Sequence, residues 1–279
     1  MEEKRHRLWD AHVHLFPARL FKAIWQWFEK FGIFMPYKGL SHQKLTGQLT
    51  GMGVERAFLL VYAHKENISL EINRWVHRFC LKNPMYLPFG CVHPRDENLG
   101  EVIEEALDRY DFPGFKIHYM VLEMRPDDPV FTPIYKALEK RGKGLVAHAS
   151  TAPIPGPWLG MDKIEPVLAD HPGMTVQVAH LGHYELDRAA ELMRKYSNLY
   201  LDTAWALGNN QMSVDREEIR ELFLEFPGRV LYGSDFPIIM EDPNLTVERI
   251  IKLSLPEDVT RAILWGNAAR MAKKLKTGN

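Results

Sequence analysis

This chain has few cysteines, a net charge close to zero and no long apolar run. Only two of its 279 residues are cysteine, Cys80 and Cys91, which excludes a disulfide scaffold. A formal net charge of -1 gives no reason to expect a nucleic-acid or membrane-surface partner. No apolar run is long enough to span a bilayer, and the charged first residues lead into a strand-like segment without a secretory signal. These absences predict a reduced, cytoplasmic protein.

A repeated unit fills the chain, in which a short apolar run, a polar loop and an amphipathic stretch follow one another. The apolar runs lie at 7–15, 56–62, 86–92, 114–120, 144–149, 174–180, 198–204 and 229–235. The stretches with helical spacing lie at 70–82, 99–110, 130–142, 161–171 and 187–196. Two further helices are expected near 245–254 and 256–275, separated at Leu255-Pro256 because proline stops one helix and opens the next.

Strands that alternate with helices at this spacing predict parallel pairing with right-handed crossovers. Eight units predict one α/β domain over residues 1–279, a closed (β/α)8 TIM barrel with extra C-terminal helices; an open, doubly wound sheet is the alternative. The connection after the first run, 15–40, is unusually long and aromatic. We expect it either to pack on the barrel as a helix or to cover the site as a lid. Its aromatic residues include Phe16, Trp25, Trp27, Phe28 and Phe34.

Histidines and one aspartate stand near the ends of several apolar runs. They are His12 and His14 in the first run, His118 in the fourth, His148 in the fifth, His180 in the sixth and Asp235 in the eighth. Residues two apart on a strand point the same way, so His12 and His14 project together. A lone histidine at a strand end is usually a polar group that meets solvent. Agreement among strands far apart in sequence instead predicts a divalent metal site at one end of the barrel.

Six short segments together resemble one known family. They are DAHVHLFP (10–17), GFKIH (114–118), VAHAS (146–150), VAHLGH (178–183), NLYLDTA (198–204) and GSDFP (233–237). In this order they resemble the amidohydrolase superfamily, and within it the amidohydrolase-related branch that includes hydrolases and aromatic-acid decarboxylases. The resemblance runs nearly end to end and closes with WGNAARMAK (265–273). It implies a barrel enzyme acting on a small molecule, with a homodimer as a family-level expectation.

The resemblance also implies roles for individual residues. The metal ligands would be His12, His14, His148 and Asp235. Asp235 and His180 would be catalytic, with His183 as a less favoured substitute for His180. Three imidazoles and a carboxylate suit one zinc ion best, although manganese, iron and cobalt stay open.

Four further residues are expected to line the substrate site. Lys116 and His118 share one face of the fourth run. Two-metal members of the superfamily carry a carboxylated lysine on this strand, so Lys116 is a candidate metal ligand, a charge partner for Asp235, or a polar core residue. Trp158 and Trp205 follow the fifth and seventh runs and are expected to stack on a substrate ring, with ordinary packing as the alternative.

Two reactions and one inert alternative fit this site. In hydrolysis, the main expectation, a metal lowers the pKa of water from about 15.7 toward 7. Asp235 then moves the proton while His180 polarises an amide, ester or lactone carbonyl. In the alternative, the same site removes carbon dioxide from an aromatic or unsaturated acid. A third hypothesis, a barrel that binds but does not catalyse, predicts the loss of an essential group, and none is missing.

Overall fold

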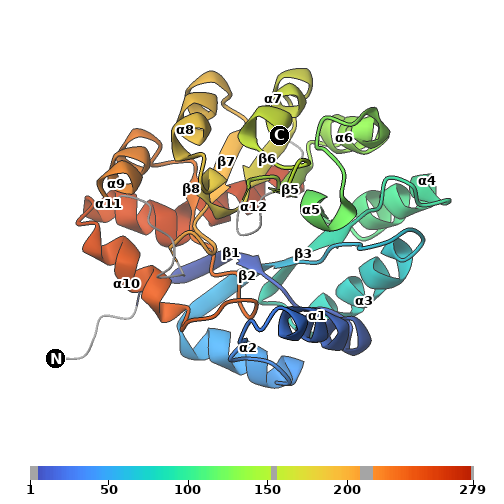
Figure 1. Ribbon diagram of the computed structural model, residues 1–279, viewed down its shortest axis with the longest axis horizontal. Helices are drawn as coiled ribbons and strands as arrows, with labels where there is room; N and C mark the ends of the chain where they lie inside the picture. The colour runs from blue at the N-terminus through green and yellow to red at the C-terminus, as the bar shows by residue number, and fades with distance from the viewer. Residues whose placement is uncertain (1–5, 152–155, 208–215, 278–279) are drawn as a thin grey trace.

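Eight short strands form the centre of the molecule, with helices around them (Figure 1). The computed structural model describes residues 6–151, 156–207 and 216–277. The strands are β1 (Leu8–Val13), β2 (Val54–Leu60), β3 (Tyr86–Cys91), β4 (Gly114–His118), β5 (Gly144–His148), β6 (Thr175–Val178), β7 (Leu199–Asp202) and β8 (Val230–Leu231). Each lies within or beside one of the eight predicted apolar runs.

The strands pair in chain order, and every pair is parallel. Beyond the short β8, a parallel bridge joins Val13 to Phe236. The backbone N–H of Asp235 donates to the carbonyl of His12 at 2.9 Å, and that of Ala11 donates to Tyr232 at 2.8 Å. These contacts bring the last strand back to the first. The predicted (β/α)8 barrel is therefore confirmed over an open sheet.

Helices cover the outside of the barrel. Those on the first half are α1 (Ala18–Lys30), α2 (His42–Gly51), α3 (Ser69–Lys82), α4 (Leu99–Ile103) with the π-helix η1 (Glu104–Arg109), α5 (Tyr119–Leu122), η2 (Pro129–Phe131) and α6 (Thr132–Lys140). The second half carries α7 (Met161–Asp170), η3 (His180–Gly182), α8 (Leu186–Lys195) and α9 (Arg216–Glu225). The predicted helices are present, but α2 and α9 were not predicted, and the stretch 99–110 changes from α to π geometry.

The C-terminal helices are also present, with the expected break between them. They are α10 (Asn244–Lys252), α11 (Glu257–Arg261), the π-helix η4 (Ala262–Gly266) and α12 (Asn267–Thr277). Pro256 directly precedes α11, as its fixed φ and missing N–H favour. None of the helices in the described ranges has the length and apolarity needed to cross a membrane.

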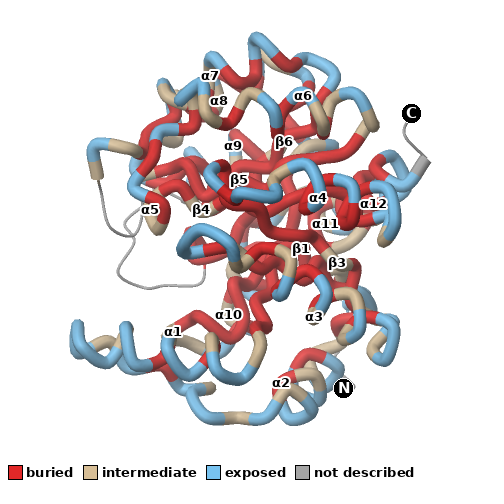
Figure 2. The backbone as a smooth tube through the Cα atoms, turned by 90° about the vertical axis from the view of Figure 1, so that its right-hand side faces the viewer, coloured by how far each residue is buried: buried red, intermediate tan, exposed pale blue. Residues whose placement is uncertain are grey.

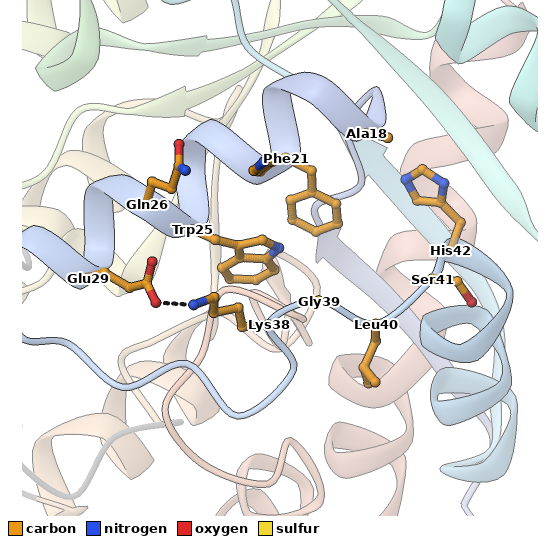
Figure 3. A pocket seen from close by; sticks show the side chains of 11 residues that line it. Ala18, Phe21, Trp25, Gln26, Glu29, Lys38, Gly39, Leu40, Ser41 and His42 are labelled. Atoms are coloured by element: carbon orange, nitrogen blue, oxygen red, sulfur yellow. Dashed lines mark hydrogen bonds and ion pairs between the residues drawn. The ribbon is translucent and has the colours of Figure 1, made fainter.

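Burial follows this layering: the strands and the inner helix faces are buried, and the outer helix faces are exposed (Figure 2). The long first connection forms α1, which buries Phe21 and Trp25 but leaves Trp27 exposed; Phe34, beyond the end of α1, is exposed as well. A cavity of about 510 Å³ lies between α1 and the segment that leads to α2, with the ion pair of Glu29 and Lys38 at its rim (Figure 3). The expectation that this connection packs as a helix is met for the buried face of α1. Its role as a lid over the site stays a prediction.

Candidate active site and metal centre

The predicted site residues gather at the C-terminal ends of the strands, where a β/α barrel carries its active site. Six aromatic rings form a closed circuit there, and consecutive ring centroids lie 3.9 to 5.9 Å apart. In order, the members are His12, His14, Tyr62, His118, His148 and His180. Chain topology therefore brings together five histidines predicted from sequence. It adds Tyr62, which sequence reasoning missed although Tyr62 ends the second apolar run.

Three candidate metal-ligand atoms meet at one side of this circuit. Nε2 of His12 lies 3.1 Å from Nε2 of His14, and Oδ1 of Asp235 lies 3.3 and 3.1 Å from these two nitrogens. All three side chains are buried. Tetrahedral bonds of about 2.0 to 2.1 Å place neighbouring ligand atoms about 3.3 to 3.4 Å apart. The spacing therefore fits one divalent cation shared by the three residues.

Hydrogen bonds on the outer side of the rings determine which nitrogen carries each proton. Nδ1 of His14 lies 2.8 Å from the carbonyl oxygen of Leu60, and a carbonyl only accepts, so Nδ1 is the donor. Nδ1 of His12 likewise donates to a carboxylate oxygen of Asp202 at 2.9 Å. In a neutral ring the other nitrogen then carries a lone pair. Both Nε2 atoms thus present lone pairs to the cluster.

The same argument shows which nitrogen of His148 carries the proton. Nδ1 of His180 donates to the carbonyl of Ala204 at 2.9 Å, which leaves a lone pair on its Nε2. That lone pair accepts from Nδ1 of His148 at 3.0 Å. The lone pair on Nε2 of His148 is consequently buried and has no partner among the described residues. A buried, orphaned lone pair near other ligand atoms fits a cation, although His148 lies outside the tight clusters that include His12. Its ligand role stays a prediction.

Burial keeps the imidazoles of His12, His118 and His148 neutral, which is the form that binds metal. It lowers the pKa of His12 to about 4, and Lys116 adds to the effect. Burial also holds the pKa of His148 and that of His118 well below the ordinary histidine value. For Asp235, burial works to raise the pKa, but its interactions with His14, His12 and His180 hold the pKa below the usual range. The donor set at neutral pH is therefore neutral nitrogen and carboxylate oxygen.

Asp202, at the end of β7, is a central residue that sequence reasoning missed. One carboxylate oxygen accepts from Nδ1 of His12 and, at 2.6 Å, from Nε2 of Gln177. The other accepts from the backbone N–H groups of His180 and Ala204, each at 3.1 Å. Asp202 thereby orients His12 and holds the turn after β6. The signal was present in the sequence, since Asp202 lies in the NLYLDTA segment.

An Asp202→Asn variant should bind a divalent cation about 10 to 100 times more weakly than the wild type. A neutral amide accepts less strongly from Nδ1 of His12, so the ring loses basicity and orientation. Competition with a chromogenic chelator measures the change. Asp127→Asn is the matched control, because Asp127 pairs with Arg125 away from the metal cluster. Equal metal affinity in Asp202→Asn and wild type would contradict the role.

Lys116 is fully buried on β4, and its Nζ lies 3.3 Å from Nε2 of His12. Burial lowers its pKa to about 8, while Asp202 and Asp235 act in the opposite direction. Lys116 therefore places positive charge directly beside the ligand cluster. Asp10 supports the cluster differently: its Oδ1 accepts from the backbone N–H groups of His12 and Ser234, each at 3.0 Å, and so ties β1 to the segment after β8.

The backbone at the site adopts an unusual conformation. His180, Trp205 and Asp235 all have positive φ, at 66°, 59° and 65°. Such values are uncommon for residues other than glycine and indicate strain that the surrounding contacts hold in place. The three residues follow β6, β7 and β8, so the turns aim these side chains individually. Strand periodicity does not predict their directions.

His183 lies apart from the circuit that includes His180. Its ring is buried, and neither nitrogen has a hydrogen-bond partner in the part of the chain that the structure describes. Burial lowers its pKa to about 4, and His180 adds to the shift.

Acidification should therefore destabilise the fold partly through His183. Between pH 6.5 and about 4 the unfolded ring takes up a proton that the folded ring excludes, so the free energy of unfolding falls as pH falls. Urea unfolding at pH 7 and pH 5 measures this loss. A His183→Gln variant is expected to lose less stability over the same interval. Identical losses in the two proteins would contradict the assignment.

The predicted substrate-stacking residues have different environments. Trp205 is buried and its Nε1–H donates to the carbonyl of Ile238 at 3.0 Å, which links the loops after β7 and β8. Trp158 is half-buried in the loop between β5 and α7. Residues 152–155 of that loop lie outside the described residues. Stacking on a substrate stays a prediction for both tryptophans.

Comparison with known proteins agrees with this geometry. The amidohydrolase family model matches residues 9–272, so the chain belongs to the amidohydrolase family, a family of enzymes. A 6-methylsalicylic acid decarboxylase from Penicillium expansum is 28% identical over 186 residues; the match covers 52% of this chain and 55% of that protein. The chain thus aligns with about half the length of this relative.

Solved structures show the same fold. A 5-carboxyvanillate decarboxylase from Sphingomonas paucimobilis has a TM-score of 0.72 at 16% identity, with 96% of this chain and 99% of that chain covered. A 5-carboxyvanillate decarboxylase from Novosphingobium aromaticivorans, complexed with manganese and 4-hydroxy-3-methoxy-5-nitrobenzoic acid, has a TM-score of 0.69 at 14% identity, with 98% and 97% covered. Family and candidate cluster together support a divalent metal.

Proposed function

We propose that this protein is a metal-dependent, non-oxidative decarboxylase of a small aromatic carboxylic acid. The sequence match to a 6-methylsalicylic acid decarboxylase carries the proposal, and the decarboxylases among the structural neighbours support it. Hydrolysis, the main expectation from the sequence, is the less supported reaction. Carbon–carbon cleavage, its alternative, is the better supported one.

His12, His14, His148 and Asp235 would hold the cation. Bound there, a divalent cation supplies positive charge that orients anionic oxygens and withdraws electrons from them. The donor set of three imidazoles and one carboxylate favours zinc, and manganese is the competing ion because a related structure contains it. Elemental analysis of the purified protein decides between the two ions.

Decarboxylation replaces the carboxylate of the ring by hydrogen. A proton is added to the ring carbon, and the electrons of the broken carbon–carbon bond return to the ring as carbon dioxide leaves. We assign the transfer of the proton to Asp235, whose Oδ1 lies at the ligand cluster: its carboxylate takes a proton from solvent water and passes it to the ring carbon. His180, stacked on His12 with centroids 5.3 Å apart, holds His148 in orientation and is proposed to face the substrate.

A substrate panel tests this function. Protein loaded with zinc or manganese is incubated with hydroxylated and methylated benzoates, and carbon dioxide and the ring product are measured. In parallel, lactones, esters and amides are assayed for hydrolysis. Release of carbon dioxide with stoichiometric ring product supports the proposal. Hydrolysis of a lactone, ester or amide without carbon dioxide release from any acid would overturn it.

A further inference from the structure

Tyr62 and His118 are adjacent members of the aromatic circuit that the ligand cluster does not use. Their ring centroids lie 4.9 Å apart, with the planes at 63°. Both side chains are half-buried. Tyr62 also contacts His14 and Phe16, with centroids 5.9 and 5.0 Å away, and His118 stacks on His148 at 3.9 Å. Both rings are therefore held in place by packing, next to the cation cluster.

Each ring of this pair carries one polar atom that can donate a hydrogen bond. Nδ1 of His118 is buried and has no partner among the described residues. A buried N–H without an acceptor is rarer than a buried acceptor without a donor, so the proton belongs on Nε2, the nitrogen that is not buried. The hydroxyl of Tyr62 is likewise not among the buried, unpartnered atoms. A phenol is protonated at neutral pH and can donate. The pair thus offers two donors on neighbouring rings.

In the four remaining rings of the circuit, Nδ1 already donates a hydrogen bond to a protein atom. Nδ1 of His12 donates to Asp202, and Nδ1 of His14 donates to the carbonyl of Leu60. Nδ1 of His180 and Nδ1 of His148 are used in the same way, toward Ala204 and His180. Of the six rings, only Tyr62 and His118 keep a donor for a ligand.

We propose that Tyr62 and His118 form a paired-donor seat that binds the carboxylate of the aromatic substrate. Two adjacent donors match the two oxygens of a carboxylate, and a hydrogen bond to a charged acceptor is stronger than one between neutral groups. Lys116 is buried two residues before His118 on the same face of β4 and adds positive charge to the site, beside His12. The identity of the ligand rests on the proposed function. The position of the donors does not.

Binding of benzoate and benzamide tests the seat. The two probes share ring and size, but the amide lacks the negative charge and one acceptor oxygen. Benzoate is first checked to release no carbon dioxide, and both are titrated calorimetrically into the metal-loaded protein. Wild type should bind benzoate more tightly than benzamide. Tyr62→Phe and His118→Phe keep the ring packing but remove one donor each, and each should weaken benzoate binding roughly 10-fold to 100-fold. Benzamide binding should change by less than about 3-fold.

Metal content and a matched variant complete the test. Both variants should retain the wild-type metal stoichiometry, which separates the seat from the cation cluster. Tyr110→Phe is the control, because Tyr110 is also half-buried and stacks on a histidine, His77, with centroids 3.9 Å apart. It should bind both probes as the wild type does.

The outcomes separate the seat from the proposed function. Selective loss of benzoate affinity in both variants supports the seat even where no acid is decarboxylated. Unchanged benzoate affinity in the variants overturns the seat even where carbon dioxide is released. A wild type that binds benzamide as tightly as benzoate overturns it as well.

Discussion

An Asp235→Asn variant is expected to release carbon dioxide from its aromatic acid about 100 to 10,000 times more slowly than the wild type, the range that a positioned acid or base contributes. The amide keeps an oxygen beside His12 and His14 but carries no transferable carboxyl proton. The loss should therefore fall mainly on kcat. Single-turnover measurement of ring-product formation, at saturating substrate and with metal content measured on the same sample, checks this.

The control for this variant is Asp242→Asn, an exposed aspartate whose carboxylate accepts from the backbone N–H of Asn244. It should retain wild-type turnover. Wild-type turnover in metal-loaded Asp235→Asn would show that another group moves the proton. Loss of turnover that is fully explained by loss of metal would make Asp235 a ligand only.

A His148→Ala variant is expected to lose more than about 100-fold in metal affinity, beyond what removal of an outer partner costs. The reason is the buried lone pair on Nε2, which has no partner in the described ranges and which a cation would satisfy. Decarboxylation should fall in parallel at limiting metal. Equilibrium dialysis against buffered zinc or manganese, followed by elemental analysis, measures the affinity.

His171→Gln is the matched control, because His171 is also buried but pairs with Glu139 at 2.9 Å, outside the aromatic circuit. It should bind metal as the wild type does. His148→Ala with unchanged metal affinity would leave the cation to His12, His14 and Asp235. His148 would then be a packing partner of His118 and His180.

Asp202→Asn and His148→Ala test different parts of one site. Asp202 acts through Nδ1 of His12 and leaves all ligand atoms in place, so a graded loss of affinity is expected. His148 supplies a ligand atom in the proposed site, so a larger loss is expected. A larger loss of metal affinity in Asp202→Asn than in His148→Ala would contradict this assignment of the two roles.

The barrel and most of the histidine set follow from sequence because they depend on local periodicity. Apolar runs that alternate with amphipathic stretches predict parallel strands and covering helices. Since strands of a closed barrel share one C-terminal face, polar residues at their ends converge whatever their separation in sequence. This reasoning placed His12, His14, His148 and His180 at one end of the molecule. The periodicity did not predict the helices α2 and α9. The motifs did not decide between hydrolysis and decarboxylation.

The roles of Tyr62, Asp202 and the individual ring nitrogens depend on the tertiary structure alone. Asp202 and His12 are 190 residues apart, and no local pattern relates them. Which nitrogen of His148 is free follows from a chain of contacts through His180 to a carbonyl on the next loop. The alternation of apolar and polar residues can be read directly from the sequence. The sequence therefore determined the fold and the end of the barrel at which the candidate site residues gather. The hydrogen-bond partners of these side chains depend on how the barrel closes, because closure determines which donor lies beside which acceptor.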